Sequence, residues 1–249
     1  MNLLASELLK LRTTRMVYAL LGALLLIVAL FTVLGIFTTQ KAELARESDQ
    51  SGFWSSASTG IIFVLLLGVM LIAGEYRHGT ITQTFLITPV RWRVLAAKLV
   101  AGAVLGFAFG LIAELFTMLL VVPLMNIRGV DVIFGHRAWS LMLGTILVTT
   151  LCGALGVAVA SVIRNQVAAI ITVFAGLLIV EPILGHALGI KWPELPKYLP
   201  GHAIGGVIGD DEGGLTRQWS ALVLLGYIGV LSLIGERAFL SRDVNSIQS

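Results

Sequence analysis

The stretch VLAAKLVAGAVLGFAFGLIAELFTMLLVV, residues 94–122, carries only two charged side chains, Lys98 and Glu114. An α-helix rises about 1.5 Å per residue, so a helix over this stretch is longer than the roughly 30 Å hydrocarbon core of a bilayer. So long a run with so few charges predicts a transmembrane helix.

Five further apolar runs are long enough, or nearly so, to span a bilayer. Hydrophobic residues make up 57% of the 249-residue chain and charged residues 12%, whereas about 25% charge is ordinary in soluble domains. We therefore expect an all-α, polytopic membrane protein, with one transmembrane domain over residues 1–249 and six spans at about 16–37, 57–73, 94–122, 138–163, 167–184 and 219–239.

The distribution of basic residues predicts the orientation. Six spans place both termini on one side, and the segments of that side hold most of the 17 Lys and Arg residues. Positive residues accumulate on the cytoplasmic side of membrane proteins. We expect a multi-pass protein of the plasma (inner) membrane with both termini cytoplasmic, residues 75–88 and 164–166 inside, and residues 40–55 and 185–218 outside. In the last of these segments, Pro200 and the apolar residues after it predict a short helix at about 201–208.

Residues 1–15 have the pattern of a helix lying in the inner membrane interface. Leucines at positions 3, 4, 8 and 11 recur at helical spacing, and Glu7, Lys10 and Arg12 fall on other faces. The alternative is a charged flank that only sets topology.

Residues 74–93 predict a helix, an elbow and a second helix on the cytoplasmic side. Thr80 is placed to cap a short helix, and Thr88-Pro89 fits the N-cap and first position of the next span. Phe85 and Leu86 are exposed to water unless a partner covers them. A loop lying against the membrane is the alternative.

Four motifs in the chain resemble those of type-2 ABC exporter permeases, the six-helix membrane subunits of ABC transporters. The motifs are SELLKLR at 6–12, GEYRHGT at 74–80, TPVR at 88–91 and IRNQ at 163–166. The resemblance implies a coupling helix that docks on a separate ABC ATPase subunit through Glu75, Arg77, Gly79, Thr80, Thr84, Phe85, Leu86 and Thr88. It also implies a dimer with a second copy or a homologous permease, and a substrate path along the shared face.

The chain has no Gly-x-x-x-x-Gly-Lys-Ser/Thr loop to bind nucleotide phosphates. We therefore expect no ATPase activity and no bound cofactor in this chain, with ATP and Mg held by the partner subunit. No basic patch interleaved with aromatic residues predicts nucleic-acid binding. The expected contacts are the ATPase, a second permease and membrane lipid.

Two features lie inside the predicted third span. Gly102, Gly106 and Gly110 form consecutive Gly-x-x-x-Gly steps that admit a close helix neighbour. We favour packing within the subunit, with a dimer seam as the alternative. Glu114, about 24 Å from Lys98 along the helix, is a substrate-path candidate or a structural hydrogen-bonding group. Near the outer end of the fifth span, Glu181 has the same two alternatives, and with Pro182 we favour a boundary residue and helix stop.

The resemblance implies export, with multidrug efflux as the function it suggests. The apolar spans suit a hydrophobic or amphipathic substrate such as a drug, antibiotic, lipid or peptide. The four histidines are scattered and make no His-Glu-x-x-His pair, so we expect no metal site. An ion-coupled secondary transporter or an intramembrane lipid-modifying enzyme is the alternative. Both would require more ionisable groups within the spans.

Overall fold

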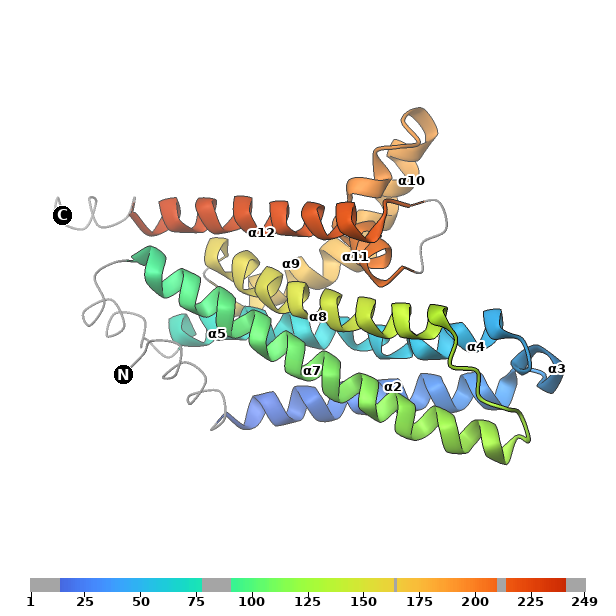
Figure 1. The fold of residues 1–249 in the computed structure, drawn as a ribbon. Coiled ribbons are helices and arrows are strands. Elements are labelled where there is room, and N and C mark those ends of the chain that lie inside the picture. Colours follow the sequence, from blue (N-terminus) through green and yellow to red (C-terminus); the bar gives the residue numbers. More distant parts are fainter. Residues whose placement is uncertain (1–13, 78–90, 164, 210–213, 241–249) are drawn as a thin grey trace, which may run out of the picture.

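The computed structural model describes residues 14–77, 91–163, 165–209 and 214–240, and these residues form helices and connecting segments without strands (Figure 1). Six helical stretches are long and apolar enough to cross a membrane. This confirms the all-α, six-span prediction. The helical elements of these stretches are α2 (Arg15–Thr38), α5 (Ile61–Arg77), α7 (Arg91–Ile127), α8 (His136–Val162), α9 (Gln166–Ala175) with η2 (Gly176–Val180) and α10 (Glu181–Lys191), and α12 (Arg217–Leu240).

Helix α8 is the centre of the bundle and packs against α5, α7 and α12. Its small residues admit neighbouring backbones: a Cβ at Gly153 would contact the carbonyl oxygen of Gly102, and one at Gly156 would contact that of Leu65. In lipid, helices associate through close van der Waals packing, because the hydrophobic effect that drives association in water does not act between them. The glycines of α8 therefore set how closely α5 and α7 approach.

The three glycines predicted as a packing stripe face α8 of the same chain. A Cβ at Gly102 would meet Gly153, one at Gly106 the carbonyl oxygen of Thr149, and one at Gly110 the Thr149 hydroxyl. The stripe thus lies at a contact within the subunit.

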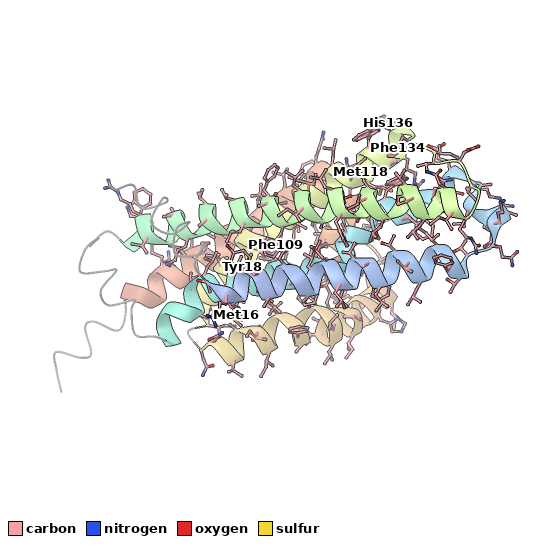
Figure 2. All side chains as sticks on the ribbon, turned by 90° about the horizontal axis from the view of Figure 1, so that it is seen from below. Met16, Tyr18, Phe109, Met118, Phe134 and His136 are labelled. Carbon is pink, nitrogen blue, oxygen red and sulfur yellow. The ribbon has the colours of Figure 1, made fainter. Side chains whose placement is uncertain are left out.

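The two ends of the bundle differ in structure. Helix α2 begins and α12 ends at the end where α5 stops and α7 starts (Figure 1). Figure 2 shows Met16 and Tyr18 at this end, and Phe134 and His136 toward the other. The opposite end carries the short elements α3 (Lys41–Leu44), α4 (Glu47–Trp54), η1 (Ser56–Gly60), η3 (Pro196–Tyr198) and α11 (Pro200–Ile208). We call this the outer end, after the predicted orientation.

The segment between the first two spans is anchored by one buried glutamine. Gln50 Nε2 donates to the carbonyl oxygens of Leu44 and Asp131, both at 2.8 Å, and Gln50 Oε1 accepts from the Ile133 N–H at 2.8 Å. The ring of Trp54 stacks 4.7 Å from that of Phe134. These contacts join α3 and α4 to the connection between α7 and α8.

Gln50→Ala should lower the free energy of unfolding by about 1–3 kcal/mol, because it removes the partner of the buried Leu44 carbonyl and of two part-buried backbone groups. Thermal unfolding in detergent measures the effect. Gln40→Ala is the matched control, since Gln40 is exposed in the same segment. Equal melting temperatures for the two variants would contradict an anchoring role.

Candidate functional site

The fifth span is the least regular of the membrane-crossing helices. It begins at Asn165, whose Oδ1 accepts from the N–H groups of Val167 and Ala168 at 2.9 and 3.2 Å. A π-helical segment, Gly176–Val180, follows α9, and α10 then continues to Lys191, leaning away from the bundle (Figure 1).

The predicted helix stop at Glu181-Pro182 is therefore wrong. Pro182 lies in the first turn of α10, where its missing N–H is tolerated. The π-helical turn before Pro182 changes the backbone hydrogen-bonding pattern at the position where proline would otherwise interrupt a regular α-helix. The predicted boundary at residue 184 falls within α10.

Glu181 caps the short helix α11 from a different element. Its Oε1 accepts from the N–H groups of Gly201 at 2.5 Å and His202 at 3.0 Å, and His202 Nδ1 lies 3.4 Å away. Leu199, the N-cap residue of α11, makes no side-chain cap bond. A Cβ at Gly201 would lie 2.7 Å from the carboxylate, so glycine gives the acid room.

The predicted short helix after Pro200 is confirmed as α11, and Gly209 ends it with φ of +91°. Sequence reasoning missed the capping by Glu181, because the residues that meet are 20 and 21 positions apart. The one local indication is that Leu199, at the start of α11, has no polar side chain that could cap this helix.

A cavity of about 250 Å³ lies between the fifth span and its neighbours, α5, α8 and α12. Its wall is almost entirely apolar, with Glu181, Tyr227 and Thr172 as its polar side chains. The Tyr227 hydroxyl donates to the Tyr198 carbonyl at 3.1 Å, which fixes the ring. The apolar lining includes Leu65, Leu155, Leu177, Leu184, Leu199 and Leu231. A space of this character suits a ligand with a hydrophobic body.

The fifth span also presents an apolar strip to its surroundings. Six of its large apolar side chains are more than half exposed in the single subunit: Val167, Ile171, Leu178, Ile179, Ile183 and Ile190. A surface of this kind faces lipid or another membrane-spanning subunit.

Glu114 lies on α7, 1% exposed, and does not line the cavity beside the fifth span. Thr145 of α8 lies beside the Glu114 carboxyl, but its hydroxyl donates to the Leu141 carbonyl at 3.0 Å. Within the described residues, neither carboxyl oxygen of Glu114 nor the buried hydroxyl of Thr117 has a hydrogen-bond partner. The structure thus separates Glu114 from the cavity and places it in a buried polar row between α7 and α8.

Most of the predicted inner-face residues lie outside the described residues. These are Glu7, Lys10 and Arg12 of the interfacial helix and Gly79, Thr80, Thr84, Phe85, Leu86 and Thr88 of the coupling segment. Glu75 and Arg77 are in the last turn of α5. Lys98, buried on α7, donates to the Leu71 carbonyl of α5 at 3.2 Å.

In the described part of the chain, no three His, Cys, Asp or Glu side chains come together as a metal site requires. The polar side chains that the described helices bring together make hydrogen bonds between elements, and these suit ligand binding and helix packing.

The family comparison decides which class of membrane protein this is. A family model described as "ABC-2 family transporter protein" matches residues 3–179, which is more than half of the chain. The chain belongs to the ABC-2 transporter family. No curated protein matched it.

Membership of the ABC-2 family makes this chain a multi-pass membrane subunit of an ABC transporter. The ATPase is a different subunit, and ABC-2 membrane subunits in general work with an ABC ATPase and as dimers. The matched region ends at residue 179, inside the π-helical segment. The Glu181 cap, α11 and the sixth span lie beyond it.

Proposed function

We propose that this ABC-2 subunit is the permease of an ATP-driven exporter that moves a hydrophobic or amphipathic substrate outward. The observation that carries the proposal is the apolar cavity of about 250 Å³ beside the π-helical fifth span. Apolar walls with a few polar groups bind the body of such a substrate and orient it. Drugs, antibiotics, lipids and hydrophobic peptides all meet this description.

Export requires two states with different affinity for substrate. ATP-driven closure of the partner ATPase would move the coupling segment around residues 75–88 and shift the subunit from an inward to an outward state. The strip of exposed isoleucine and leucine side chains on the fifth span suits a dimer contact with a second copy or a homologous permease. The Lys and Arg distribution supports cytoplasmic termini, and hence an ATPase on the inner side.

Transport in inside-out vesicles tests this proposal. The chain would be co-expressed with its ABC ATPase subunit, and uptake of a neutral and of a cationic hydrophobic dye followed with ATP and with a non-hydrolysable analogue. ATP-dependent accumulation supports an exporter. Uptake that ionophores abolish while ATP remains would instead favour ion-coupled transport, and lipid modification without ATP would favour an intramembrane enzyme.

Phe85→Asp should weaken association with the ATPase by about tenfold or more, because it places a charge in a contact that excludes water. Copurification and ATP-driven uptake measure the loss. Gln40→Asp adds the same charge at an exposed position of the outer end and is the control. Wild-type copurification and uptake by the Phe85 variant would remove the coupling role.

A further inference from the structure

In the cavity beside the fifth span, only one of the two carboxylate oxygens of Glu181 has hydrogen-bond partners. Glu181 is 7% exposed, and its hydrogen bonds from Gly201 and His202 all fall on Oε1. Its other oxygen, Oε2, makes no hydrogen bond within the described residues. Glu181 is one of the residues that line the cavity, and Oε2 is the carboxylate oxygen without a hydrogen-bond partner there.

The local backbone cancels only part of the carboxylate charge. Glu181 sits at the N-terminal end of α11, a nine-residue helix. The partial positive charge of a helix N-terminus is about half of an elementary charge. The N–H groups of α11 and the His202 ring all lie at Oε1, so Oε2 is the oxygen left to attract a cation.

The rest of the cavity favours a particular kind of cation. Tyr227 offers an aromatic ring at the same cavity, and its hydroxyl is held by the Tyr198 carbonyl. Carboxylate and aromatic ring together are a usual combination for organic ammonium groups. A strongly hydrated metal ion would gain little from walls as apolar as these.

We propose that the cavity between the fifth span, α8 and α12 binds an amphipathic organic cation, with its ammonium group at Glu181 Oε2 and its apolar body along the leucine-lined wall. This site names the substrate class of the exporter proposed above and rests on that proposal. A membrane phospholipid carrying an amine shares the same chemistry, and we assign the site to a free amphipathic cation.

Binding to the full chain in nanodiscs tests the assignment without the ATPase. The lipid is phosphatidylglycerol, which carries no amine, and the probes are hexyltrimethylammonium and hexylsulfonate, which have the same tail and opposite charges. Calorimetric titration, corrected with empty nanodiscs, should show saturable binding of the ammonium probe and none of the sulfonate. Equal binding of the two probes, or no binding of either, overturns the proposal.

Glu181→Gln should weaken binding of the ammonium probe by about tenfold or more, which corresponds to about 1.4 kcal/mol. The amide oxygen still accepts from Gly201 and His202, so α11 keeps its cap. The matched control is Glu194→Gln, which removes an exposed carboxylate paired with Lys197 at 2.7 Å. An unchanged Glu181→Gln affinity, or an equal loss in the Glu194 variant, overturns the proposal.

A second variant decides the matter if Glu181→Gln does not fold. Gly176 lines the cavity, and a Cβ there meets no atom within 4 Å, so the side chain of Gly176→Leu starts in open space beside the site. It should abolish probe binding at an unchanged melting temperature. Wild-type affinity in this variant contradicts the site.

Three further results are informative. The first distinguishes a lipid amine from a free cation, and the other two distinguish failure of the exporter proposal from failure of the binding-site proposal. Loss of probe binding in phosphatidylethanolamine nanodiscs would give the site to lipid and overturn the assignment to a free cation. Cation binding without ATP-driven uptake of either dye, the cationic one included, would reject the exporter and keep the site. Dye uptake without discrimination between the two probes would keep the exporter and reject the site.

Discussion

Gly153→Leu is expected to prevent the helix bundle from assembling. A Cβ at this position would contact the carbonyl oxygen of Gly102 and lie 3.2 Å from the Gly106 Cα. Both are backbone atoms of α7, so relief requires the whole helix to move. The single methyl group of Gly153→Ala should already cost about 1–3 kcal/mol, the usual range for overpacking a tight contact.

Size-exclusion profiles and thermal unfolding in detergent measure this effect. Gly226→Leu is the matched control, because Gly226 lies on α12 and a Cβ there meets no atom within 4 Å. The control should keep a monodisperse profile and a melting temperature close to wild type. A folded Gly153→Leu protein with wild-type stability would contradict the contact between α7 and α8.

The six spans could be predicted because a membrane-spanning helix needs a long run of apolar residues, and such runs can be read directly from the sequence. A helix that faces hydrocarbon needs apolar side chains along its whole length. The run 138–163 accordingly matches α8, His136–Val162, within two residues at each end. The short helix α11 also followed from local signals, since Pro200 opens it and Gly209 closes it.

Helix partners could not be predicted in the same way. The Gly-x-x-x-Gly steps of α7 are visible in the sequence, but similar small residues occur in other spans. Only the fold shows that Gly153 and Gly156 of α8 meet α7 and α5. A stripe of small residues predicts a close contact and leaves its partner open.

The fifth span misled sequence reasoning for a different reason. The residue before a proline is biased away from the helical region, so Glu181-Pro182 predicted an end. Proline in a membrane helix is tolerated when neighbouring turns and side chains satisfy the freed backbone groups. Here a π turn precedes it, and the same glutamate reaches forward to cap α11.

Glu114→Leu is expected to make the protein more stable and a poorer transporter. The Glu114 carboxyl is 1% exposed and has no hydrogen-bond partner within the described residues. An unsatisfied buried polar group costs about 1–3 kcal/mol, and a leucine of similar volume removes that cost. A costly acid inside a span is most readily explained by a task in transport, such as a rearranged contact in the outward state.

Melting temperature and ATP-driven dye uptake must be measured on the same preparations of this variant. Thr117→Val is the matched control. It removes a second buried polar group without a partner, the Thr117 hydroxyl one turn along α7, and leaves the charge unchanged. The control should raise or preserve stability and keep uptake at the wild-type level, since it leaves the acid in place. Glu114→Gln, which keeps the shape and polarity of the side chain, should fall between wild type and Glu114→Leu in both measurements. A less stable Glu114→Leu protein with full uptake would show that the acid has a structural role, and would remove it from the transport path.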